Sequence, residues 1–189
     1  MNRLHRWFCR SEHWARAVEQ QLLPWVFEGT AELGENVLEV GPGPGRVTDV
    51  LCRRAARVTS IEIDDRLAKS LETRYAGTNV TVVHGDATEM PFEDARFSSA
   101  VCLTMLHHVP SPAHQDRLIA EVRRVLRPGA PFIGSDSRWS WPFHLMHVFD
   151  TMVLVDPDDF GRRLQRAGFV QVRVDKEPTA FRFRAECPR

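Results

Sequence analysis

An apolar strand pattern runs directly into a glycine-rich loop in the stretch Val37-Leu38-Glu39-Val40-Gly41-Pro42-Gly43-Pro44-Gly45. Glycine at every second position lets the backbone turn tightly, and it lets a bulky ligand lie against the main chain because no Cβ is in the way. Arg46 then opens a helix, and the amides and dipole at a helix N-terminus attract such ligands. The stretch therefore predicts a nucleoside-like cofactor at the carboxyl end of the first strand.

The spacing of these glycines separates two classes of cofactor. The dinucleotide fingerprint is G-x-G-x-x-G, but here the third glycine is Gly45, one residue early, and Arg46 holds the fingerprint position. Pro42 and Pro44 remove two amide donors that a pyrophosphate would use. The Glu39 carboxylate repels a pyrophosphate and attracts an ammonium group. The loop thus favours an amino-acid-bearing nucleoside and disfavours a nicotinamide oxidoreductase.

The acid–glycine pattern of residues 39–45 resembles motif I of the class I S-adenosylmethionine-dependent methyltransferases. The next motif of that family follows in order, because residues 57–64 read as a second strand that carries an acid. An acid about 20 residues beyond the first glycine is the expected partner of ribose hydroxyls. The resemblance implies that Glu62 binds both hydroxyls and that Ile63 packs on the adenine.

A third motif completes the resemblance, which spans roughly residues 30–175. Residues 79–84 read as a strand, and the following Gly85-Asp86-Ala87 implies that Asp86 accepts a hydrogen bond from the adenine amino group. The implied cofactor is S-adenosylmethionine. The predicted cofactor-binding residues are Glu39, Gly41, Gly43, Gly45, Glu62, Ile63, Asp86, Ala87 and Thr104.

Strand and helix patterns alternate along the chain, which is typical of a parallel α/β sheet. Strands are expected at residues 36–41, 57–64, 79–84, 97–103, from 131, 170–174 and 180–185. Helices are expected at residues 11–27, 46–55, from 64 or 65, 112–126 and from 157. The family's sheet also has seven strands, the last of them antiparallel. We therefore predict a doubly wound, seven-stranded, mostly parallel sheet with helices on both faces, a Rossmann-like methyltransferase fold.

The composition predicts one domain without a preference for polyanions. We expect residues 1–189 to form a single domain in which residues 1–30 supply a covering helix. Lys+Arg and Asp+Glu number 25 each, so the net charge attracts neither nucleic acid nor an anionic membrane. The four cysteines are dispersed and form no metal-binding pattern. With no signal peptide or membrane span evident, we expect a cytoplasmic protein without a stable membrane anchor.

Candidate catalytic residues follow the fourth and fifth strands. A general base helps methyl transfer when the acceptor is a hydroxyl or a protonated amine, and His107, His108 and Asp136 are the candidates. In the alternative interpretation, the two histidines only shape the loop. His144 and His147 have the i, i+3 spacing of a helical metal pair, but the sequence shows no third ligand, so no metal is predicted.

Residues 137–156 form an aromatic and apolar segment after the fifth strand, and Asp150 is the only formal charge in its central part, residues 139–155. One interpretation is a lid over an aromatic or lipid-like acceptor. A second is a core helix under the sheet edge. A third is a homodimer interface or a shallow membrane contact.

Three functions compete. The first is a methyltransferase that acts on a small, apolar or lipid-like acceptor. The second is a ribosomal-RNA adenine N6-methyltransferase, because residues 37–71 resemble the adenine dimethylases; that family, however, has an Asn-x-Pro-aromatic motif after the fourth strand, where this chain has Thr104-Met105-Leu106-His107. The third is a non-catalytic S-adenosylmethionine-binding protein.

Overall fold

The computed structural model describes residues 11–29, 33–148 and 150–189, and a single seven-stranded sheet organises them in the order β3-β2-β1-β4-β5-β7-β6. Strands β1 to β5 are parallel, and β7 is antiparallel to both of its neighbours. The strands are β1 Asn36–Val40, β2 Arg57–Glu62, β3 Val80–His84, β4 Ser99–Leu103, β5 Pro131–Ser137, β6 Val170–Lys176 and β7 Ala180–Glu186. The predicted seven-stranded, mostly parallel α/β sheet is thereby confirmed.

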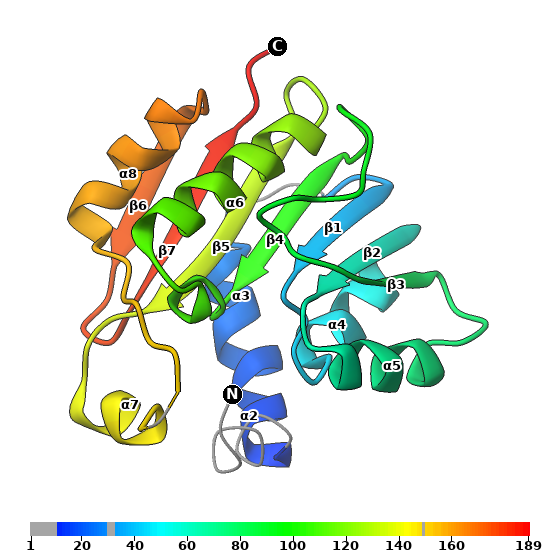
Figure 1. Cartoon of the computed structure of the whole chain (residues 1–189), viewed down its shortest axis with the longest axis horizontal. Helices are drawn as coiled ribbons and strands as arrows, with labels where there is room; N and C mark the ends of the chain where they lie inside the picture. The colour runs from blue at the N-terminus through cyan, green and yellow to red at the C-terminus, as the bar shows by residue number, and fades with distance from the viewer. Residues whose placement is uncertain (1–10, 30–32, 149) are drawn as a thin grey trace.

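Helices cover both faces of this sheet. Figure 1 shows α6 and α8 in front of the strands and α3 behind them. The helices are α2 Glu12–Ala17, the π-helical turn η1 Val18–Leu22, α3 Leu23–Val26, α4 Arg46–Arg54, α5 Asp65–Arg74, the 3₁₀ turn η2 Leu106–His108, α6 Pro112–Val125, α7 Trp141–Met146 and α8 Pro157–Arg166. None of the helices in the described residues is long and apolar enough to cross a bilayer.

Two apolar cores lie on opposite faces of the central strands. Successive strand residues point to opposite sides, so Val37 joins the core under α4 whereas Leu38 joins the core under α6. Both side chains are fully buried. A central strand that is apolar on both faces is rigid, and it holds the loop at its carboxyl end in a fixed position.

Short polar side chains start several of the helices. Asp64 accepts hydrogen bonds from two amides in the first turn of α5, and Ser111 accepts one from the His114 amide of α6. Ser140 and Asp156 cap α7 and α8 in the same way. Such caps satisfy backbone amides that have no partner within the helix.

The structure differs from the predicted elements in two places. The expected strand at residues 97–103 begins only at Ser99, and Phe97 makes an isolated bridge to Leu126. The expected helix at residues 11–27 is interrupted by the π-helical turn η1, which lies just before Pro24; proline has no amide to donate, and this favours an irregular turn. Residues 1–10 of the predicted covering segment lie outside the described residues.

Candidate active site

A cavity lies where the order of the sheet changes direction. β2 and β3 extend the sheet on one side of β1, and β4 and β5 extend it on the other. Loops leaving strands at such a switch point diverge and open a crevice at the carboxyl edge. The cavity there measures about 900 Å³, and every predicted cofactor-binding residue except Gly45 lines it, together with His107 and His108.

The glycine loop is built from three left-handed residues, with φ of 68° at Gly41, 54° at Gly43 and 85° at Gly45. A Cβ added at Gly41 would meet the Met105 side chain at 2.2 Å, and one added at Gly45 would meet Leu71 at 2.7 Å. At Gly43 no atom lies within 4 Å, because this residue faces the cavity. Gly45 instead caps α4 and is not among the residues that line the cavity, so its place in the cofactor site stays a prediction.

Glu39 is a buried carboxylate in which only one of the two oxygens accepts hydrogen bonds from the described residues. Its Oε2 accepts hydrogen bonds from Thr48 Oγ1 at 2.7 Å and from Ser60 Oγ at 2.6 Å. Its Oε1 is buried and has no hydrogen-bond partner among the described residues. Burial raises the pKa of Glu39 to about 7, against the two hydroxyl hydrogen bonds that lower it. Glu39 lines the cavity, so an ammonium group bound there would satisfy the uncompensated oxygen.

Glu62 connects the end of β2 to the glycine loop. Its Oε2 accepts a hydrogen bond from the Gly43 amide at 3.0 Å, and its Oε1 accepts one from the Asp64 amide at 2.9 Å. Burial raises the pKa of Glu62, and these amide hydrogen bonds lower it. Both oxygens keep further lone pairs, so the carboxylate can accept two more hydrogen bonds from a ligand in the cavity.

The remaining predicted cofactor residues line the same cavity with different exposure. Ile63 is 66% exposed, an apolar side chain open to the space above the sheet. Asp86 is exposed, and its Oδ1 accepts a hydrogen bond from the Thr88 amide at 2.7 Å. Ala87 and Thr104 are half-buried. Residues from three separate strand ends therefore share one wall.

On the other side of the cavity lies His107, which forms a pair with a buried carboxylate. His107 and Asp136 are 2% and 1% exposed, and His107 Nδ1 lies 2.5 Å from Asp136 Oδ1. The His107 amide donates to Asp136 Oδ2 at 3.0 Å, and the Ser137 amide donates to Oδ1 at 2.6 Å. Asp136 does not line the cavity but lies behind His107, so its catalytic role stays a prediction. His107 Nε2 is buried and has no hydrogen-bond partner among the described residues.

The sequence did not identify two ring contacts from the 137–156 segment. Phe143 and His147 of this segment line the cavity, and their ring centroids lie 5.0 Å from that of His107. His144, which the helical spacing paired with His147, is exposed. Burial distinguishes the two histidines, and the only signal in the sequence was the apolar character of the segment.

The comparisons with known proteins identify the family. The family described as "Methyltransferase domain" matches residues 38–134, about half of the chain. The chain belongs to this family. It is a class I S-adenosylmethionine-dependent methyltransferase domain, as the three motifs predicted, and S-adenosylmethionine is its cofactor.

This methyltransferase domain is similar to curated relatives with different functions and to a solved methyltransferase structure. A ribosomal RNA small subunit methyltransferase A of Deinococcus radiodurans is 47% identical over 64 residues, which are 34% of this chain and 22% of the relative. A ubiquinone biosynthesis O-methyltransferase of Azotobacter vinelandii is 29% identical over 136 residues, 66% of this chain and 55% of the relative. A methyltransferase structure from Aquifex aeolicus aligns with a TM-score of 0.77 at 17% identity over 99% of both chains, which shows the shared fold. The domain thus spans about half the length, or less, of these two curated relatives.

Proposed function

We propose that this methyltransferase domain transfers the methyl group of S-adenosylmethionine to a small, apolar or lipid-like acceptor that binds between the glycine loop and α7. The observation that carries the proposal is that the buried His107–Asp136 pair opens onto the same cavity as the glycine loop. A cofactor site alone would need no such second wall. The relative with the longer of the two alignments, named for O-methylation in ubiquinone biosynthesis, supports a small-molecule acceptor.

The residues of the cofactor side fit the cofactor. When bound, S-adenosylmethionine supplies a methyl group already activated by a sulfonium centre. Glu39 Oε1, buried without a partner among the described residues, takes the ammonium group of the methionine part. Glu62 takes the ribose hydroxyls, and Ile63 and Asp86 contact the adenine. Orientation of this kind contributes about 7–11 kcal/mol to catalysis in favourable cases.

The residues of the acceptor side exclude water and orient the acceptor. Leu118, Met105 and Phe143 give this side of the cavity an apolar lining. Asp136 holds the His107 ring in place, so that Nε2, which is buried and has no hydrogen-bond partner among the described residues, offers a lone pair. An acceptor with an apolar body and one polar group matches this arrangement, because the polar group pairs with His107 while the body displaces water.

The ribosomal-RNA alternative rests on the 47% identity over 64 residues. That stretch covers only 34% of this chain and 22% of the relative. The chain also carries no net positive charge that would attract RNA. The residues after β4 also lack the Asn-x-Pro-aromatic motif expected of an enzyme that flips adenine out of a helix.

A transfer assay tests the proposal. The purified chain is incubated with S-adenosylmethionine labelled in the methyl group and with two panels, one of hydroxylated aromatic and isoprenoid compounds and one of ribosomal RNA. We expect label in an organic-soluble product and none in RNA. Label in RNA alone would establish the alternative. Binding of S-adenosylhomocysteine without transfer to any acceptor would favour the non-catalytic protein.

A further inference from the structure

Three histidine rings gather where η2 meets α7. One ring nitrogen from each of His107, His108 and His147 lies within 4.8 Å of one from each of the others. The ring centroids of the three pairs are 4.2, 5.0 and 5.3 Å apart. Two of the rings come from the end of β4 and the third from a segment some 40 residues further along, so the fold, not local sequence, assembles the cluster.

The hydrogen bonds around the rings set their tautomers. His107 Nδ1 lies 2.5 Å from Asp136 Oδ1, and His147 Nδ1 lies 2.8 Å from the Phe143 carbonyl oxygen. His108 Nδ1 lies 3.3 Å from the Thr151 carbonyl oxygen. Each Nδ1–H can donate to its oxygen, and the neutral ring then carries its lone pair on Nε2.

This is the arrangement that metal-binding histidines usually have. Such a histidine donates its other ring N–H to a carboxylate or a carbonyl, which fixes the ring and makes the ligand nitrogen more basic. His107 has the stronger form of this support, a carboxylate 1% exposed. Its Nε2 is buried and has no hydrogen-bond partner among the described residues. A metal ion is a group that would pair with this nitrogen.

We propose that His107, His108 and His147 bind one divalent transition-metal ion of the zinc class, with Asp136 orienting His107. Neutral imidazole nitrogens suit zinc and its neighbours, whereas magnesium and calcium prefer oxygen ligands. Ring stacking alone accounts for the packing of Phe143 on His147, at 4.1 Å between centroids. It does not account for a His107 ring nitrogen that is buried without a hydrogen-bond partner among the described residues, in a ring that packs beside two other imidazoles.

The distances between the ring nitrogens imply that a bound ion would draw α7 toward η2. In a tetrahedral site with Zn–N bonds of about 2.0–2.1 Å, the ligand nitrogens are about 3.3 Å apart. The present separations extend to 4.8 Å. His147 is the ligand carried by the 137–156 segment, so we expect binding to bring α7 closer to η2.

The site also specifies the acceptor, an extension that rests on the proposed function. Three protein ligands leave one position of a tetrahedral ion open, as in catalytic zinc sites. All three histidines line the cavity, so an acceptor bound in the cavity could reach an ion that they hold. A metal ion there binds oxygen and lowers the pKa of a bound hydroxyl. The acceptor class is then a phenol or another hydroxyl compound.

Metal titration of the full chain tests the site without acceptor or methyl transfer. Chelator-treated protein is titrated with Zn²⁺ by calorimetry and with Co²⁺ by visible absorption. We expect one ion per chain and the intense bands of tetrahedral Co²⁺. His147→Ala should lower the Zn²⁺ affinity by more than about 10-fold, a loss at least as large as that of an outer-shell partner. His144→Ala is the matched control, because His144 is exposed on the same helix.

A second variant and a separate binding measurement distinguish loss of the metal site from loss of the folded structure. His108→Ala, at a half-buried position, should weaken Zn²⁺ binding as His147→Ala does, while each variant keeps its affinity for S-adenosylhomocysteine. Equal Zn²⁺ affinity in the His147→Ala and His144→Ala proteins would overturn the metal site, and the proposed methyl transfer would stand. Zn²⁺ bound by all three histidines, together with no transfer to any hydroxyl acceptor, would instead remove the acceptor assignment and leave the metal site intact.

Discussion

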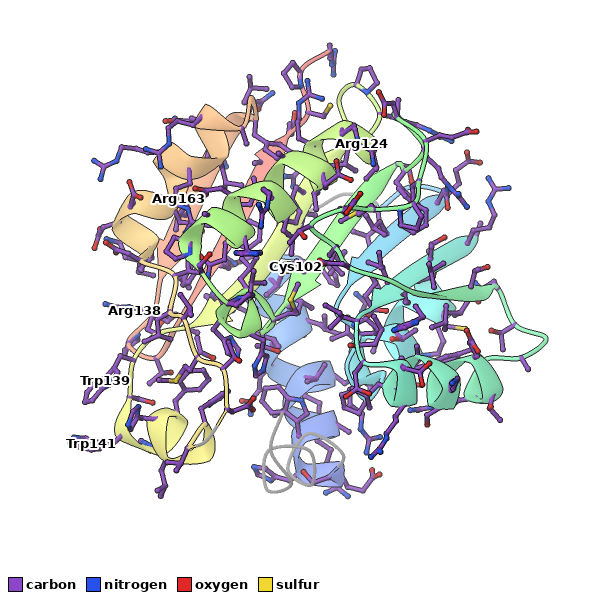
Figure 2. All side chains as sticks on the ribbon, viewed as in Figure 1. Cys102, Arg124, Arg138, Trp139, Trp141 and Arg163 are labelled. Carbon is purple, nitrogen blue, oxygen red and sulfur yellow. The ribbon has the colours of Figure 1, made fainter. Side chains whose placement is uncertain are left out.

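The two sides of the cavity are held in different ways. On the cofactor side, residues 39–45, 62–64 and 85–88, the Glu39 and Glu62 carboxylates are fixed by hydrogen bonds from α4, β2 and the glycine loop. On the other side, residues 137–156, which we propose to be a lid and call the lid side, the helix has six residues, and Trp141 and Leu145 are 73% and 69% exposed. Figure 2 shows Trp139 and Trp141 on the outer side of α7, directed away from the sheet.

The difference matches what each side has to recognise. A common cofactor can be bound by a rigid turn between two buried strands, because its shape does not change from one enzyme to another. Acceptors vary, and variation is tolerated best in segments that a rigid scaffold only anchors. Two of the hydrogen bonds that anchor this segment involve Val153: its amide donates to the His107 carbonyl at 2.8 Å, and Gln115 Nε2 donates to its carbonyl at 2.9 Å.

Replacing Gly43 by Val should produce the largest loss on the cofactor side. The residue has φ of 54° and faces the cavity, so a branched side chain both strains the turn and occupies the space of the ligand. We expect the affinity for S-adenosylhomocysteine, measured by calorimetry, to fall by more than about 100-fold, roughly 3 kcal/mol.

Gly77→Val is the matched control for backbone strain. Gly77 has φ of 78° with no atom within 4 Å of an added Cβ, and it does not line the cavity. Both variants should lose about 1–2 kcal/mol of stability, but only the change at Gly43 should affect binding. Normal binding by Gly43→Val would show that the loop does not hold the cofactor.

Glu39 makes the stability of the ligand-free protein depend on pH. Its pKa is about 7 in the folded state, against 4.5 as the ordinary value, so the folded state binds more protons than the unfolded state between these two pH values. The unfolding free energy must then fall as pH rises through this window, by about 3 kcal/mol in total. Glu62, whose pKa is also raised, adds a slope of the same sign.

Glu39→Gln should remove the contribution of Glu39. Urea unfolding without cofactor at pH 5 and pH 8 should show a smaller stability loss in the variant than in the parent. The exposed Glu89 offers a control, because Glu89→Gln should keep the parent slope. Equal slopes in all three proteins would mean that Glu39 is not a buried, uncompensated carboxyl.

The sequence motifs brought together the residues that line the cavity beside the glycine loop, but they did not predict the contacts of residues 137–156, for a physical reason. Glu39 and Glu62 lie within the last two residues of their strands and Asp86 follows its strand, and the carboxyl ends of parallel strands meet at one edge. Local pattern was sufficient there. The pairing of His107 with Asp136 depends on β4 lying beside β5, and the approach of His147 depends on how the 137–156 segment returns to η2. No local spacing encodes that return, and helical spacing paired His147 with the exposed His144 instead.

Asp86→Ala should have a moderate effect on the cofactor side. Asp86 is exposed, so losing one hydrogen bond to the adenine amino group should cost about 0.5–1.5 kcal/mol, or about 2- to 12-fold in affinity for S-adenosylhomocysteine. Asp86→Asn separates two causes, because its carbonyl still accepts from the Thr88 amide while its NH₂ group opposes the adenine. Binding that stays at the parent level in both variants would remove Asp86 from the site.

The smallest effect is expected at the outer surface of the lid. Trp141→Ser removes a side chain that is 73% exposed, so the unfolding free energy should change by no more than about 0.5 kcal/mol, and S-adenosylhomocysteine affinity should stay the same. The Trp141 ring lies outside the cavity lining, so the KM for an acceptor should also stay unchanged. Sedimentation analysis of parent and variant completes the measurement, because an exposed pair of indoles is an apolar patch of the kind that mediates association. A parent dimer that dissociates in the variant would mean that a second chain stabilises residues 137–156. The contrast between the two sides of the cavity would then hold only for the monomer.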